Sequence, residues 1–203
     1  MSTVLTLPQS GDTAITFDIS SLATSSTFLA GRESNQIDNT STAYADVMVY
    51  VKPITGHAST APTVGQQIQL YLWGSKESLA TTAIDVLDGT DSAETLSHAS
   101  ILQSLAFVAA PTVTVATAGL TYYIKPFCVA PFFGGVMPKF WGLFLAHNHT
   151  GALAASQSSL FSYSGVSPTN TVRGSSPPMV IPVGDVSSTV SQKSLSKSPS
   201  SLA

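Results

Sequence analysis

His147 and His149 are separated by one residue, a spacing that can serve metal binding. On an extended strand, residues two apart point to the same face, so both imidazoles could ligate one ion. A structural zinc site needs four ligands, however, and neither a third nor a fourth follows nearby. Asn148, Thr150 and Gly151 are residue types common in turns. The pattern therefore favours a polar turn over a metal site.

Four carboxylates occur close together at Asp85, Asp88, Asp91 and Glu94, and oxygen ligands of this kind can bind calcium. Their spacing does not match the EF-hand loop. The pair Asp88 and Gly89 is typical of a solvated turn, which the sequence favours instead. Glycoside hydrolysis would need two carboxylates held across a sugar, and acidic residues outside this cluster are sparse.

Cys128 is the only cysteine, so the chain can form no internal disulfide bond. It lies between Phe127 and Val129, where a thiol usually behaves as a small buried hydrophobe. The sequence contains no Gly-x-Ser-x-Gly nucleophile motif and no phosphate-binding or dinucleotide-binding loop. We therefore expect no enzymatic activity, no cofactor and no bound metal.

Charged side chains are rare: Asp, Glu, Lys and Arg make up 9% of the 203 residues, against about a quarter in ordinary soluble domains. From Thr95 to Val172 only Lys125 and Lys139 are charged. A free enzyme would display more charge, so we expect other chains to cover much of this surface, as in an assembly subunit. The net charge of −3 and the scattered basic residues predict no direct nucleic-acid partner.

Two segments alternate in the way that is typical of half-buried strands, Tyr44–Val51 and Gln66–Trp73. The second places aliphatic residues inward and points Tyr71 and Trp73 outward, toward a neighbouring subunit or solvent. Shorter runs rich in β-branched or aromatic residues are also predicted as strands. These runs are Ala14–Ser20, Leu102–Ala109, Thr112–Thr117, Thr121–Val129, Lys139–Ala146 and Ser159–Tyr163.

Helical spacing is weak throughout, although a short helix could form within Ser92–Leu105. Phe127–Ala146 approaches membrane-spanning length, but prolines, glycines and a lysine interrupt it, so we expect two strands joined by a loop and no membrane partner. Ser26–Asn39 is interpreted as a charge-balanced loop, in which Arg32 could reach a carboxylate of its own loop or of another subunit. The sequence thus predicts an all-β protein, an antiparallel β-sandwich of jelly-roll type.

The sandwich domain is expected to span residues 12–166, between an N-terminal arm at 1–11 and an extended Ser/Pro-rich C-terminal arm at 167–203. The N-terminal arm lacks the basic and apolar parts of a secretory signal, which suits folding in a reducing cytosol. An apolar part of the C-terminal arm could lie along an edge strand or groove of another subunit; the alternative is a tail without a partner. The residues predicted at interfaces are Arg32, Glu33, Tyr71, Trp73, Pro178, Val180 and Ile181.

Several motifs between Gly31 and Val166 resemble small structural proteins encoded by tailed bacteriophages. The first are the segment Gly31–Asn39, with the sequence GRESNQIDN, the strand Tyr44–Val51, and QLYLWG at Gln69–Gly74. The same pattern continues in PFCVA at Pro126–Ala130, FGGVMP at Phe133–Pro138, FWGL at Phe140–Leu143 and NHTGA at Asn148–Ala152.

The resemblance implies a virion structural protein without catalytic residues. A capsid decoration or cement protein would bind the major capsid protein on the outside of an icosahedral head, where it would bridge and stabilise capsomers. It would act as a homotrimer or another homo-oligomer and would lie on the capsid surface after synthesis in the host bacterial cytoplasm. The alternative is a tail or head-fibre component that binds host surface glycans, with Tyr71 and Trp73 as an aromatic platform.

Overall fold

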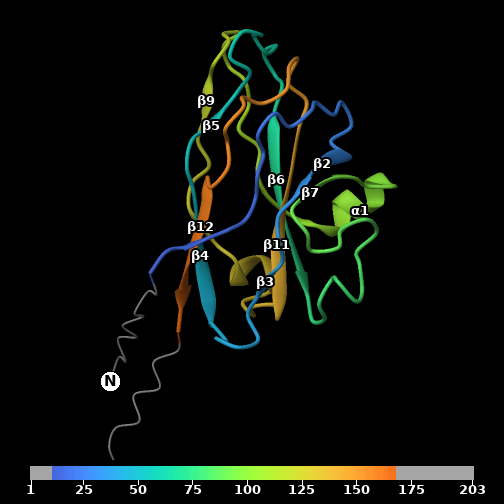
Figure 1. Ribbon diagram of the computed structural model, residues 1–203, viewed down its shortest axis with the longest axis vertical. Coiled ribbons are helices and arrows are strands. Elements are labelled where there is room, and N and C mark those ends of the chain that lie inside the picture. Colours follow the sequence, from blue (N-terminus) through green and yellow to red (C-terminus); the bar gives the residue numbers. More distant parts are fainter. Residues whose placement is uncertain (1–10, 168–203) are drawn as a thin grey trace, which may run out of the picture. The chain divides into compact units, whose positions relative to one another are not determined.

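Two antiparallel β-sheets face each other across a shared apolar core in the computed structural model, which describes residues 11–167 (Figure 1). The all-β prediction is confirmed, whereas the jelly-roll topology stays a prediction. The first sheet has the strand order β1 (Thr13–Ala14), β12 (Phe161–Val166), β4 (Asp46–Val51) and β10 (Phe127–Cys128).

The second sheet is larger and has β11 (Phe140–His147) at its centre. Its strand order is β7 (Ser92–Thr95), β2 (Ala30–Glu33), β11, β6 (Ile68–Ser75) and β8 (Ala106–Ala109), and β3 (Ile37–Asp38) also pairs with β11. The remaining elements are the paired strands β5 (Ile54–Thr55) and β9 (Thr121–Tyr122), the helix α1 (Ala99–Ser104) and the 3-10 helix η1 (Ala130–Phe133).

The core between the sheets follows the predicted alternation. Val47 and Val49 of β4 are fully buried, as are Leu70 and Leu72 of β6. Together with side chains of β11 and β12 they form one cluster. Successive strand residues point to opposite faces, so the other residues of β6 and β11 must lie on the outer face of the second sheet.

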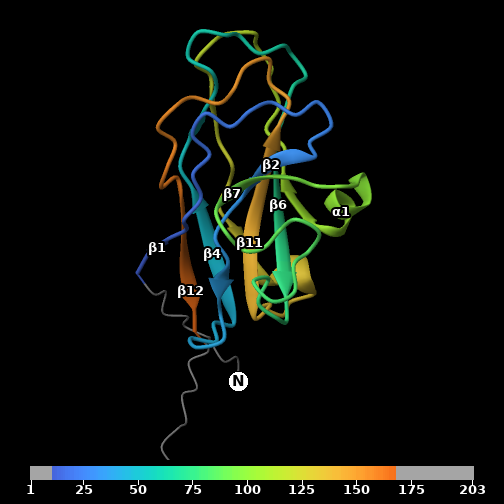
Figure 2. The same ribbon diagram turned by 45° about the vertical axis from the view of Figure 1, so that its right-hand side comes forward.

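That outer face carries a second core, on the side of the sheet where the green chain that follows β6 runs (Figure 2). The chain from 76 to 105, here called the cover, packs Leu79, Leu87, Leu96 and Leu105 against it. Beneath the cover, Tyr71 and Trp73 are only 7% and 1% exposed. The prediction that these two rings face a neighbour or solvent is therefore wrong. Alternation identified their face correctly, but it carries no information about which segment covers that face.

The predicted loop Ser26–Asn39 instead contains β2 and β3. Between them, Ser34 exchanges hydrogen bonds with Leu143 of β11: its backbone N–H donates to the carbonyl at 2.9 Å, and its Oγ accepts the Leu143 N–H at 2.9 Å. The buried residues of β2 are Gly31 and Glu33, so no apolar alternation marks this strand.

Other predicted strands are shorter than expected. Leu102–Ala109 begins inside α1, which confirms the predicted short helix, and becomes a strand only at Ala106. Thr112–Thr117 contributes a single bridge, and Thr121–Val129 holds two strands of two residues each. Phe127–Ala146 is two strands joined by a loop, as predicted, and the search of residues 11–167 finds no helix long and apolar enough to cross a membrane.

Candidate contact surface

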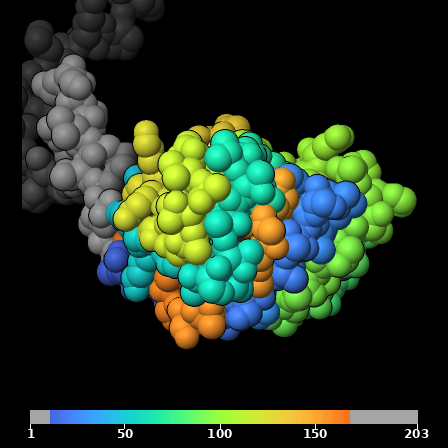
Figure 3. Space-filling view, turned by 90° about the horizontal axis from the view of Figure 1, so that it is seen from above, coloured from blue at the N-terminus to red at the C-terminus, as the bar shows by residue number. Residues whose placement is uncertain are grey.

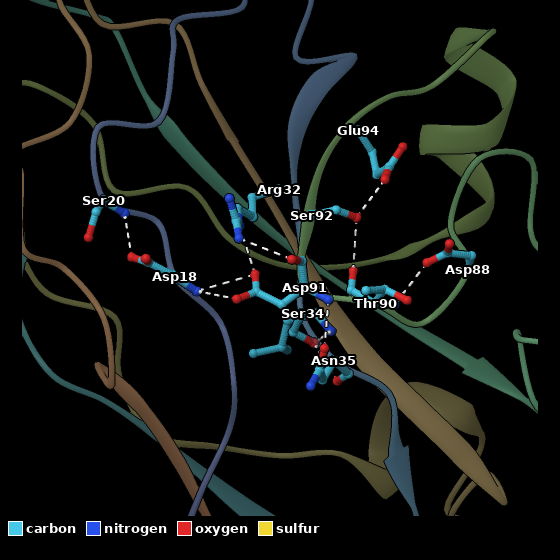
Figure 4. A network of polar contacts seen from close by, with 11 residues as sticks. Asp18, Ser20, Arg32, Ser34, Asn35, Asp88, Thr90, Asp91, Ser92 and Glu94 are labelled. Carbon is cyan, nitrogen blue, oxygen red and sulfur yellow. Dashed lines mark hydrogen bonds and ion pairs between the residues drawn. The ribbon is translucent and has the colours of Figure 1, made fainter.

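Arg32 binds the cover of its own chain (Figure 4). Its Nε donates to Asp91 Oδ1 at 2.7 Å, and its Nη2 donates to the Asp91 backbone carbonyl at 3.0 Å. The other Asp91 oxygen accepts the Asp18 backbone N–H at 3.1 Å. Arg32 was predicted to reach a carboxylate either of its own loop or of another subunit. The carboxylate that it reaches belongs to its own chain, but it lies on the cover and not in the same loop.

The residues after Arg32 extend this attachment. The Glu33 carboxylate accepts backbone N–H groups from Asp88 at 3.0 Å and Gly89 at 3.1 Å. Asn35 Oδ1 accepts the Asp91 N–H at 2.6 Å, and Gln36 Oε1 accepts the Leu79 N–H at 2.7 Å. We call Arg32, Glu33, Asn35 and Gln36 the clamp. Glu33 is completely buried within the chain, so the prediction that it lies at an interface is wrong.

Carboxylates of the acidic cluster accept hydrogen bonds from nearby residues of the cover. Asp85 accepts both the N–H and the hydroxyl of Ser97 at 2.7 Å, and Asp88 accepts the Thr90 N–H at 2.9 Å. Gly89 has a φ of +83°, which glycine adopts without strain. Gly89 and Thr90 form a bend, whereas the turn of this region falls earlier than predicted, at Asp85 and Val86. Within residues 11–167, no three His, Cys, Asp or Glu side chains are grouped so that they could hold a metal ion.

Burial raises the pKa of Glu33 to about 8, even though two backbone N–H groups favour the ionised form. The ordinary value is 4.5, so the folded state holds a proton that an unfolded chain would release. The stabilisation from this group is therefore fully present below pH 4.5 and lost as the pH rises to about 8.

We expect the free energy of unfolding to fall between pH 6.5 and 8, by at most about 1.4 kcal/mol per pH unit. Glu33→Gln cannot ionise and should remove this slope, whereas Glu77→Gln at an exposed position should keep it. Urea unfolding at several pH values between these limits measures the effect. Equal slopes in wild type and Glu33→Gln would contradict the assignment.

His147 and His149 are both buried, at 0% and 2% exposure, so the prediction of a polar turn at this pair is wrong for the side chains. His147 is the last residue of β11, and its Nε2 lies 2.9 Å from the Leu22 carbonyl. The His149 ring lies 5.3 Å from the His147 ring and 4.9 Å from the Tyr122 ring, measured between centroids. Neither His149 nitrogen has a hydrogen-bond partner.

One end of the sandwich is built from segments that contain no charged residue (Figure 3), although Lys52 reaches one of them, where its Nζ donates to the Ser159 carbonyl at 3.2 Å. Four segments meet there, at the end of β11 that finishes with His147, and none contains Asp, Glu, Lys or Arg. We call them together the charge-free end: residues 19–29, 53–67, 111–124 and 148–160. Every charged residue between 11 and 167 lies outside these segments, although Asp18, Lys52 and Lys125 directly adjoin them in the sequence.

The charge-free end is held together by backbone hydrogen bonds between its segments. The Gly65 N–H donates to the Val113 carbonyl, Gly56 donates to Leu120, and Ser21 donates to Ala154. Between these contacts the surface presents Ser, Thr and Ala, together with three large exposed side chains. Val64 is 59% exposed, Val115 57% and Tyr123 73%. The result is an ordered surface of methyl and hydroxyl groups.

The predicted interface residues thus separate into three groups. Arg32 and Glu33 belong to the clamp, and Tyr71 and Trp73 belong to the second core. Pro178, Val180 and Ile181 lie outside the described residues. The charge-free end contains none of them. The only sequence signal for this end was the low charge between Thr95 and Val172. Comparison of the chain with protein-family models, curated proteins and solved structures finds no match.

Proposed function

We propose that this protein is a structural subunit of a bacteriophage virion, namely a decoration or cement protein that binds the major capsid protein through its charge-free end. The observation that carries the proposal is the gathering of four uncharged segments at one end of the sandwich. Charged residues are depleted at the centres of protein interfaces because each buried charge loses its hydration. Segments without charged residues have no charge hydration to lose when they are buried in an interface.

The proposed mechanism is mechanical. A protein that binds the assembled capsid lattice and not the separated subunits stabilises the lattice by mass action. Each contact of methyl and hydroxyl groups contributes modestly, but the icosahedral lattice repeats it many times, and a homotrimer or other homo-oligomer would engage several sites together. The protein would then reside on the capsid surface.

The phage resemblance supports this function through the fold rather than through a shared binding site. Its first motif, Gly31–Asn39, contains the whole clamp, and its third, Gln69–Gly74, contributes Tyr71 and Trp73 to the second core. These motifs therefore mark residues that attach the cover to the second sheet. The contact surface lies largely elsewhere.

The alternative of a glycan-binding fibre component depended on Tyr71 and Trp73 as an exposed platform. Both rings lie beneath the cover, and the Tyr71 hydroxyl donates to Gln69 Oε1 at 2.6 Å. A buried ring offers no face on which a sugar could stack. The decoration role does not depend on these two residues.

Aspartate at an exposed position of the charge-free end should weaken capsid binding. Val115→Asp and Val64→Asp each place a carboxylate in the proposed interface, and we expect at least a tenfold loss of affinity, equivalent to about 1.4 kcal/mol. Co-sedimentation with capsids that lack the protein measures this loss. Val136→Asp is the matched control, because Val136 is 70% exposed and lies near the start of β11, at the opposite end.

Salt provides an independent measurement on the same particles. Screening acts on charges and leaves apolar burial intact, so wild-type binding should persist in about 1 M sodium chloride. Release of the protein at moderate salt would contradict a contact through the charge-free end. Equal binding by Val115→Asp, Val136→Asp and wild type would contradict it as well.

A further inference from the structure

The buried histidine pair lies where the segments of the charge-free end converge. His147 reaches the Leu22 carbonyl of segment 19–29, and that same carbonyl accepts the Leu153 N–H of segment 148–160 at 3.0 Å. The His147 carbonyl accepts the Ser25 N–H at 2.7 Å. His149 packs on Tyr122 of segment 111–124. The pair therefore touches three of the four segments.

The hydrogen bonds of His147 fit only its neutral form. Its Nε2 lies against a carbonyl and must donate a proton, while its Nδ1 lies 3.3 Å from the His149 backbone N–H and must accept one. A second proton would be added at Nδ1, where it would face another donor. Protonation of His147 therefore breaks the link to the backbone of His149.

If His149 gains a proton, the new N–H finds no hydrogen-bond acceptor. Both of its ring nitrogens and the Tyr122 hydroxyl are buried without partners. The titratable groups facing it are His147 and Tyr122, and His57 lies close by against Gly151. None of the surrounding segments carries a carboxylate that could compensate an imidazolium charge.

We propose that His147 and His149 form an acid-sensitive latch, which holds the segments of the charge-free end together while both rings are neutral and releases them when a proton is added. The latch follows from the geometry of the isolated chain. Only its consequence, a contact surface that loosens in acid, rests on the proposed function.

The direction of the pH dependence follows from burial. Burial lowers the pKa of His147 below its ordinary value of 6.5, and burial with the neighbouring His147 lowers that of His149 to about 4. Both groups bind protons more readily in an unfolded chain. Their stabilisation is therefore fully present above pH 6.5 and is lost as the pH falls from 6.5 toward 4.

Hydrogen exchange of the full-length protein at pH 7.5 and pH 4.5, corrected for intrinsic exchange rates, tests the latch. We expect amide protection in residues 19–29 and 148–160 to fall at least tenfold at the lower pH, with β4 and β12 less affected. His149→Phe keeps a ring against Tyr122 and removes one of the two protonation sites, so it should lose less protection in acid than wild type, in which both His147 and His149 can be protonated. His98→Gln changes an exposed histidine and should respond as wild type does.

Either of two results would overturn the latch. One is equal acid loss of protection in His149→Phe and His98→Gln. The other, which needs no variant, is an NMR titration of the folded wild type in which the His149 ring titrates near 6.5 without loss of protection. Because these measurements use isolated protein, failure of capsid binding leaves them unaffected, and their failure leaves the capsid proposal standing.

Discussion

Trp73→Ala is expected to destabilise the fold by about 3–5 kcal/mol, the range found when a large buried aromatic is truncated. The indole is 1% exposed and packs in the second core. It lies directly against Gly142 of β11, where even one added methyl group would overlap the ring. Alanine would leave a cavity beneath the cover that this closely packed sheet cannot collapse to fill.

Urea unfolding followed by circular dichroism measures the effect of Trp73→Ala. Trp73→Phe should recover much of the stability, since it restores a ring and removes an indole N–H that has no hydrogen-bond partner. Tyr123→Ala, at a 73% exposed aromatic, should change stability by no more than about 0.5 kcal/mol. A Trp73→Ala protein as stable as wild type would mean that the cover does not pack on the sheet, and the glycan platform would become available again.

Gly31→Ala is expected to cost about 3 kcal/mol, the upper part of the range for overpacking. A Cβ at this position would overlap the Leu145 backbone carbonyl and lie 2.6 Å from Phe144 Cζ. A side chain can change rotamer, but a carbonyl within a β-ladder can move only if the strand moves. The pairing of β2 with β11 must therefore shift, and β2 carries Arg32 and Glu33 of the clamp.

Thermal unfolding together with tryptophan fluorescence would report both the lost stability and a loosened cover above Trp73. Gly11→Ala is the control, because no atom lies within 4 Å of a Cβ built there. If Gly31→Ala and Gly11→Ala melt at the same temperature, β2 does not approach β11 as closely as described.

Strands whose buried face is aliphatic could be predicted from the sequence, and β4, β6 and β11 are all present near the expected residues. β2 could not be predicted, because its inward positions are Gly31, which fits beneath Phe144, and Glu33, which binds backbone N–H groups. Such residues are buried for steric and hydrogen-bonding reasons that hydropathy patterns do not detect.

The clamp and the charge-free end depend on contacts between distant parts of the chain. Arg32 and Asp91 are 59 residues apart, so only the folded chain reveals that they are partners. Low charge between Thr95 and Val172 is visible in the sequence, and the expectation that other chains cover this surface stays a prediction. Two of the four segments at the charge-free end, 19–29 and 53–67, lie outside that stretch, and their convergence depends on sheet topology.

The placement of charge also affects how a copy of the protein would arrive at a lattice. Within residues 11–167, the cover contributes the carboxylates Asp85, Asp88 and Glu94, and Asp91 paired with Arg32, while the segments of the charge-free end contribute none, so charge is distributed unevenly over this part of the chain. Such a distribution can orient a molecule during diffusional encounter without contributing to the contact that finally forms. Electrostatics would then govern how quickly a copy finds its place, and apolar burial would govern how long it stays.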